Sequence, residues 1–142
     1  MEATVRKGEG IVVDTQSYRK TEPASGDLIV FNRDGTLFLK RLVAKSGHTI
    51  IGYDQKIFVD GNELKEPYVY HIGILSQELD NFGPVYVPAG KLFVMGDNRD
   101  VSLDSRTHSF GLVDESALIG KALYVVRGKD KRQGIDLTRP SE

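Results

Sequence analysis

The 142-residue sequence contains no cysteine. The chain can therefore form no disulfide, and it offers neither a thiolate nucleophile nor a cysteine ligand for a metal. It also has no run of about 18 apolar residues, which is the length that a membrane span requires. No charged segment followed by an apolar one opens the sequence, as it would in a secretory signal peptide. We therefore expect the chain, as given, to be soluble.

An excess of charge of one sign is also missing. Lysine and arginine number 19 against 20 aspartates and glutamates, for a net charge of −1. This balance gives no basic surface for nucleic acid, so we expect no nucleic-acid partner. The three histidines, His48, His71 and His108, lack the paired spacing and the nearby carboxylates of a metal motif, so we expect no metal and no cofactor.

Short β-branched runs separated by turn residues are present throughout the sequence. They cover residues 11–13, 27–31, 37–44, 49–51, 56–59, 63–64, 85–87, 91–95 and 123–126. This pattern predicts a mainly β fold of twisted, largely antiparallel sheets, with a partly open, barrel-like core and a small β-hairpin lobe. The chain is long enough for one domain with a real core.

The domain is expected to span residues 1–126, with the small lobe and a mobile loop within residues 49–90. Residues 71–83 have no regular period and lie between Gly73 and Gly83, so they are the expected mobile loop. A one-turn helix should begin at Asp114 and end at Gly120. Residues 127–142 form a polar tail that we expect to be poorly ordered.

A polar segment follows the predicted strand at residues 91–95. Residues 96–106 read Gly-Asp-Asn-Arg-Asp-Val-Ser-Leu-Asp-Ser-Arg. A buried strand would deliver this segment to the edge of the core, where Gly96 suits an unusual backbone angle. Asp104 and Arg106 share a face with Ser102 if the segment is extended, and they can form an ion pair there. Taken alone, a solvated surface loop is the commoner interpretation of such a segment.

Lys40 stands in an otherwise apolar run at residues 37–44. Alternation puts Phe38, Lys40 and Leu42 on one face of the strand, so Lys40 has apolar neighbours. Burial disfavours an ammonium group, so the pKa of Lys40 should be lowered and its neutral amine can act as a general base. By spacing alone, an edge lysine whose amine reaches water is the simpler explanation.

These two segments together resemble a known family. Lys40 and Arg41, followed by Gly47, and residues 96–106 look like the two most characteristic boxes of the type I signal peptidases, membrane-bound proteases with a Ser/Lys dyad. Residues 26–31 resemble a third box, and residues 1–5 resemble the segment that follows the nucleophilic serine. The resemblance extends from residue 1 to about residue 126.

The resemblance implies roles for individual residues. Lys40 matches the general base, and Ser102 matches the hydroxyl that orients its amine. Supporting positions around them are Arg41, Asp97, Asn98, Arg99, Asp104 and Arg106. The substrate would be an extended signal peptide that adds a strand between the segment after the serine and the strand of Lys40. The residues expected to contact it are Met1, Glu2, Phe38 and Leu39.

The implied activity is removal of signal peptides from secretory precursors, on the extracytoplasmic side of the cell membrane, without metal or cofactor. By the same resemblance, the nucleophilic serine would immediately precede Met1, and the membrane anchor would lie before it. Both are outside the sequence given, so we expect the chain alone to be inactive. Two further positions depart from the family: Ala3 stands in place of a proline, and His48 stands in place of the aspartate that usually follows Gly47.

Two alternatives remain open at this point. A LexA-like self-cleaving repressor shares the dyad chemistry and a related β core, and residues 89–90, Ala-Gly, are a dipeptide of the kind that such proteins cut. The length of the box at residues 96–106 and the absence of a DNA-binding half count against it. The other alternative is a noncatalytic peptide-binding paralogue.

Overall fold

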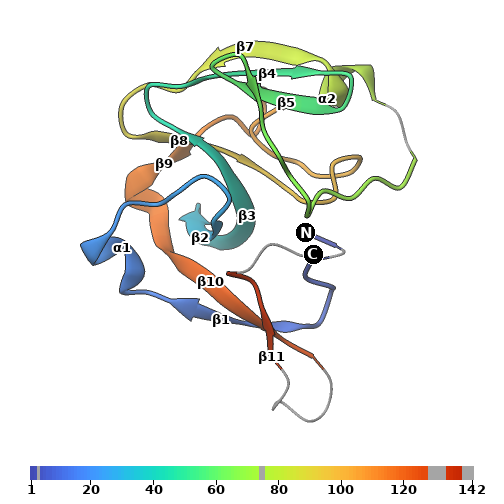
Figure 1. Ribbon diagram of the computed structural model, residues 1–142. Helices are drawn as coiled ribbons and strands as arrows, with labels where there is room; N and C mark the ends of the chain where they lie inside the picture. The colour runs from blue at the N-terminus through green and yellow to red at the C-terminus, as the bar shows by residue number, and fades with distance from the viewer. Residues whose placement is uncertain (3, 74–75, 128–133, 139–142) are drawn as a thin grey trace.

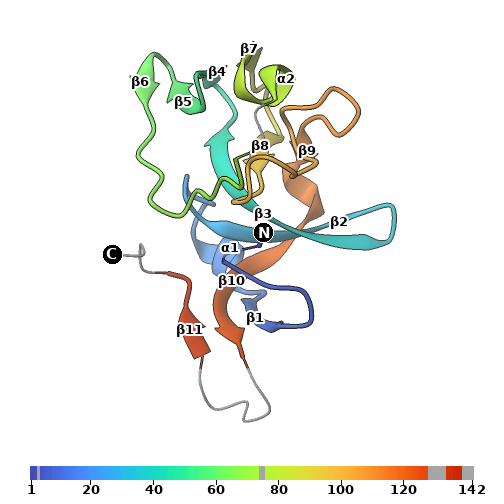
Figure 2. The same cartoon turned by 90° about the vertical axis from the view of Figure 1, so that its right-hand side faces the viewer.

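Strands are the main regular secondary structure in the computed structural model, which describes all residues except 3, 74–75, 128–133 and 139–142. They form two sheets in which every pair of neighbouring strands is antiparallel, and neither sheet closes on itself. Figure 1 shows the smaller sheet above the larger one, and Figure 2 shows the same arrangement after a quarter turn. The predicted mainly β, antiparallel and unclosed fold is therefore confirmed.

The larger sheet has the strand order β1-β10-β2-β3-β8-β9, with β11 paired to β10. Its strands are β1 (Gly10–Asp14), β2 (Leu28–Arg33), β3 (Thr36–Lys45), β8 (Lys91–Met95), β9 (Val113–Asp114), β10 (Leu118–Val126) and β11 (Gly134–Asp136). β2 and β3 form a hairpin whose turn contains Asp34 and Gly35, both with positive φ. This turn was predicted from the Asp-Gly pair, which tolerates such angles.

The smaller sheet is the predicted lobe. Its order is β6-β5-β4-β7, from β4 (Thr49–Tyr53), β5 (Lys56–Val59), β6 (Asn62–Glu63) and β7 (Phe82–Tyr86). Two short helices complete the secondary structure: α1 (Ser17–Lys20) lies between β1 and β2, and α2 (Gln77–Asp80) precedes β7. A 3₁₀ turn, η1 (Glu115–Ala117), joins β9 to β10.

β3 and β8 form a wall shared by two hydrophobic cores. One core contains Leu42 from β3 and Val94 from β8, together with residues of β2. The other contains Val43 from β3 and Met95 from β8, together with residues of the smaller sheet. Side chains alternate between the faces of a strand, so Leu42 and Val43 of β3, like Val94 and Met95 of β8, serve different cores. This arrangement fixes the end of β8, from which the polar segment 96–106 departs.

Three expectations about secondary structure differ in part from the structure. The segment 71–83 contains α2 and the start of β7 where a loop was expected, because Ser76 caps the helix by accepting a hydrogen bond from the Leu79 N–H. The predicted one-turn helix is present as η1, with Asp114 as its N-cap residue, but it ends before Gly120, because β10 begins at Leu118 and continues through Gly120. In the tail, β11 pairs with β10 where disorder was expected; residues 128–133 and 139–142 lie outside the described part.

Candidate active site

β3 directs two adjacent cations to opposite faces of the larger sheet. The Lys40 amine donates a hydrogen bond to the Oγ of Ser102 at 2.9 Å. Arg41 turns the other way and makes a double hydrogen bond to the carboxylate of Asp97, at 3.1 and 2.6 Å. One strand thus contacts segment 96–106 at two points, and both contacts cross more than 50 residues of sequence.

Lys40 is partly buried, and its surroundings favour the neutral amine. Burial is the largest cause and lowers the pKa of Lys40; the charge of Arg106 adds to this, while Asp104 and Asp97 act in the opposite direction. The net effect is a pKa below the ordinary lysine value of 10.5. The Oγ of Ser102, itself buried, can accept from the ammonium or donate to the neutral amine.

Gly96 makes the approach of Ser102 to Lys40 possible. A Cβ atom at residue 96 would lie 2.1 Å from the Ser102 Oγ and 3.6 Å from the Lys40 Nζ. The φ angle of Gly96 is not positive. The unusual backbone angle expected from the sequence is therefore not the reason for a glycine at this position. The reason is steric, since the serine side chain occupies the space that a Cβ would fill.

Segment 96–106 is held in place by buried ion pairs. Arg106 binds both oxygens of Asp104, at 2.8 and 2.9 Å, and the side chains are 1% and 0% exposed. Asp104 also accepts from the Gly96 N–H at 3.0 Å, which folds the segment back toward the end of β8. Burial alone would raise the pKa of Asp104, but hydrogen bonds and charge from Arg106 lower it overall. The ion pair predicted for these two residues is present.

Asp97 is the centre of a second buried network. Besides Arg41, its carboxylate accepts from the hydroxyl of Thr4 at 2.5 Å, and its side chain is fully buried. The Arg41 guanidinium also donates to the carbonyl of Gly26 and stacks on the ring of Tyr68, 3.8 Å from its centre. The network therefore joins the amino-terminal segment, β3 and segment 96–106.

Arg99 and Asn98 are also buried, as part of the same segment. Arg99 forms a double hydrogen bond with Glu66, at 2.8 and 2.6 Å, and donates to the carbonyl of Gly96. The backbone carbonyl of Asn98 accepts from the Ser102 N–H at 3.2 Å. The side-chain oxygen of Asn98 finds no partner among the described residues.

The residues expected to contact a peptide belong to the amino-terminal segment and to β3. Residues 36–40 of β3 pair with β2 on one side, while the pairing of β3 with β8 begins only at Arg41. Among the described strands, none pairs with the other edge of Phe38 and Leu39, so that edge is available to an added strand. The Sδ of Met1 accepts from the Asp97 N–H at 3.4 Å, and Glu2 is exposed.

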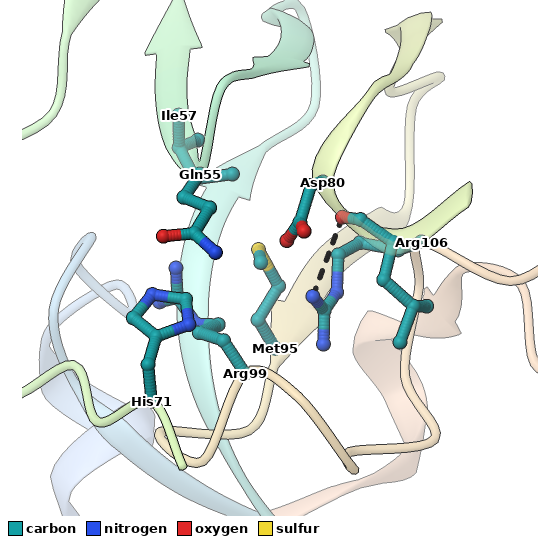
Figure 3. Close-up of a pocket in the computed structure, with 8 residues that line it drawn as sticks. Gln55, Ile57, His71, Asp80, Met95, Arg99 and Arg106 are labelled. Carbon is teal, nitrogen blue, oxygen red and sulfur yellow. Dashed lines mark hydrogen bonds between the residues drawn. The ribbon is translucent and has the colours of Figure 1, made fainter. Parts of the chain in front are cut away.

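A small cavity lies on a different part of segment 96–106. Figure 3 shows Gln55 and His71 facing Asp80 and Arg106 across it, with Met95 between them. Arg106 donates to the carbonyl of Leu79 there, at 3.4 Å. Neither Lys40 nor Ser102 lines this cavity, so it belongs to the packing between the two sheets and not to the Lys40–Ser102 contact.

Among the described residues, no three His, Asp or Glu side chains gather as metal ligands do. Within the same residues, no helix is both long and apolar enough to cross a membrane.

Comparison with known proteins decides the family. The family model "Signal peptidase, peptidase S26" matches residues 1–127. Signal peptidase I of Bacillus amyloliquefaciens is 34% identical over 132 residues, which cover 88% of this chain and 68% of that protein. The chain belongs to the signal peptidase family. This membership favours the signal peptidase over the LexA-like alternative.

Further similarities agree with the family assignment. Probable signal peptidase I-1 of Synechocystis sp. is 36% identical over 131 residues, which cover 85% of this chain and 63% of that protein. The crystal structure of a signal peptidase I from Enterococcus faecalis V583 matches with a TM-score of 0.61 and 29% identity, over 71% of this chain and 97% of that one.

Sequence reasoning missed several residues that this signal peptidase fold brings to the site. Glu66 and Tyr68 hold Arg99 and Arg41, and Thr4 holds Asp97. The two-residue spacing of Glu66 and Tyr68 puts them on one face of an extended segment, which was the available signal. The ring of Phe110 lies near the amine of Lys40, and nothing in the sequence indicated it.

Replacing Gly96 with alanine should disrupt the Lys40–Ser102 contact. The new Cβ would force Ser102 away, and overpacking of this kind costs about 1–3 kcal/mol of unfolding free energy. Gly10→Ala is the matched control, because its Cβ would meet only Val126 at 3.8 Å and its φ is not positive. Denaturant unfolding of both variants measures the difference; equal stability of Gly96→Ala and the wild type would contradict the steric explanation.

Proposed function

We propose that this signal peptidase is a serine endopeptidase that removes signal peptides from secretory precursors by Ser/Lys dyad chemistry. The hydrogen bond between Lys40 Nζ and Ser102 Oγ, 2.9 Å long and partly buried, is the observation that carries the proposal. A lysine with a lowered pKa is a suitable general base near neutral pH. Ser102 would orient the amine, and Lys40 would take the proton of the nucleophile.

The nucleophile in this proposal is a serine immediately before Met1. Burial first, and then the charge of Lys40, lower the pKa of the Met1 amino group, so the start of the described chain lies within electrostatic reach of the base. A hydroxyl at the preceding residue would enter the same region. The buried hydroxyl of Ser102 orients the Lys40 amine in this proposal and is not the group that attacks the peptide. We therefore expect residues 1–142 alone not to cleave a precursor, because the attacking hydroxyl must also lie within about 3 Å of the base.

The peptide would bind as a strand along the free edge of Phe38 and Leu39, with Met1 and Glu2 on its other side. Backbone hydrogen bonds of an added strand give affinity, and alternate side chains entering pockets give specificity. Family membership also implies a membrane-associated protein whose catalytic domain faces the extracytoplasmic side. No metal or cofactor takes part in the proposed reaction.

A cleavage assay tests the proposal. The protein is produced with the sequence encoded upstream of Met1 and incubated with a precursor peptide, and mass spectrometry identifies the products. We expect cleavage at one site, unaffected by metal chelators, and none by residues 1–142 alone. Binding of the peptide without cleavage by the extended protein would favour the noncatalytic alternative.

A further inference from the structure

Phe110 lies against the amine of Lys40. The Nζ atom of Lys40 is 5.9 Å from the centre of the Phe110 ring. This ring also packs edge-on against Phe38 at 5.7 Å and Phe31 at 6.5 Å, and Phe38 and Phe31 are stacked across β3 and β2. Phe38 and Lys40 share a face of β3, so the three rings form one apolar surface beside the amine.

Phe110 belongs to no helix or strand, and Arg33 at the end of β2 holds it. The guanidinium of Arg33 donates to the carbonyl of Phe110 at 2.8 Å and to the carbonyl of Leu112 at 2.9 Å. Its Cζ atom lies 4.2 Å from the centre of the Phe110 ring, a cation–π distance. One arginine therefore fixes both the backbone and the ring of a residue 77 positions away in sequence.

We propose that Phe110 is a positioning residue for the base, whose ring, held by Arg33, keeps water away from the amine of Lys40. The proposal rests on the function proposed above, because shielding this amine matters for catalysis only if Lys40 is the base. Phe110 also packs on Phe38, which the proposed peptide would contact. The pKa of Lys40, and not the rate of cleavage, is therefore the property that tests the proposal.

The direction of the effect follows from two opposing contributions. An aromatic face attracts an ammonium, but the distance of 5.9 Å is close to the limit of about 6 Å at which that attraction matters. Exclusion of water from the amine lowers the pKa of Lys40, and this effect outweighs the attraction to the ring, since burial is the largest cause of the lowered pKa. The other charged groups that act on the amine are Asp104, Arg106, Asp97 and the Met1 amino group.

Two substitutions separate shielding from charge. Phe110→Leu removes the ring but keeps an apolar side chain. Arg33→Lys keeps the positive charge but loses the planar fork that binds two carbonyls at once. Titration of Lys40 in protein carrying ¹³C-labelled lysine measures the pKa in each, on residues 1–142. In both variants we expect the pKa of Lys40 to rise toward 10.5, by about 0.5–1 unit for Phe110→Leu and by less for Arg33→Lys.

Matched controls are Phe58→Leu on the smaller sheet and Arg19→Lys on the exposed side of α1, and neither should change the titration. Amide spectra verify that each variant is folded; if Phe110→Leu does not fold, Arg33→Lys provides the test alone. If the pKa of Lys40 is lowered in the wild type and is the same in every folded variant, the inference about Phe110 is wrong and the proposed function is unaffected. An ordinary pKa in the wild type instead overturns the proposed function.

Discussion

Lys40→Met should lower cleavage by the extended protein by about 10²–10⁴-fold, the usual contribution of a general base. Methionine fills a similar volume and cannot take a proton. Ser102→Ala should cost less, about tenfold, because it removes one hydrogen bond that orients the amine and leaves the base in place. Lys45→Met is the control, since Lys45 lies on the same strand but pairs with the exposed Glu22. Initial rates on one precursor peptide give the comparison.

The Lys40→Met variant should not be less stable than the wild type. Burial lowers the pKa of Lys40 in the folded state, so below that pKa the folded protein holds a charge that is better solvated in the unfolded chain. This cost in unfolding free energy is present at neutral pH. It disappears as the pH rises from the pKa of Lys40 in the folded protein to its pKa in the unfolded chain. Lys40→Met should therefore unfold at an equal or higher denaturant concentration at pH 7. A folded Lys40→Met protein that cleaves as fast as the wild type would exclude Lys40 as the base.

Asp97→Asn should destabilise the fold by about 3–5 kcal/mol, because it leaves the buried guanidinium of Arg41 without its counter-charge. The two side chains are 6% and 0% exposed, so water cannot take over the interaction. The change also weakens the acceptor for the Thr4 hydroxyl. Such a loss is a large fraction of the about 5–15 kcal/mol that typically stabilises a folded domain.

Asp114→Asn is the matched control for Asp97→Asn. Asp114 also pairs with a cation, Lys91, but the side chains are 60% and 39% exposed. An exposed pair contributes about 0–1 kcal/mol, so this variant should unfold close to the wild type. Urea denaturation of both variants, followed by circular dichroism, measures the two changes. Equal losses in the two proteins would mean that the Arg41–Asp97 network is not a structural anchor.

The parts of the site that could be predicted depend on local pattern. Alternation along residues 37–44 was enough to put Phe38 and Lys40 on one face, and the two-residue spacing of Asp104 and Arg106 was enough to suggest their ion pair. The meeting of Lys40 with Ser102 needed the family resemblance, because their contact crosses 62 residues. The roles of these residues in catalysis remain predictions.

The parts that could not be predicted depend on tertiary packing. Arg33 reaches Phe110 across 77 residues, and nothing local distinguishes either from an ordinary surface arginine or loop aromatic. The function of Gly96 was misjudged because glycine suits both unusual angles and close approach, and only the position of Ser102 shows which applies. β11 was missed because a three-residue strand in a polar segment forms only through its pairing with β10.

The most direct test of the account is the titration of the Lys40 amine in the wild-type chain. As the general base, this amine would be shielded from water beside Ser102 and would lose its proton more readily than an ordinary lysine. Two-dimensional NMR of ¹³C-labelled lysine, assigned with Lys40→Met, follows the amine as the pH is raised. We predict a midpoint clearly below 10.5, the ordinary lysine value. A Lys40 midpoint at or above 10.5 would contradict the assignment of Lys40 as the base.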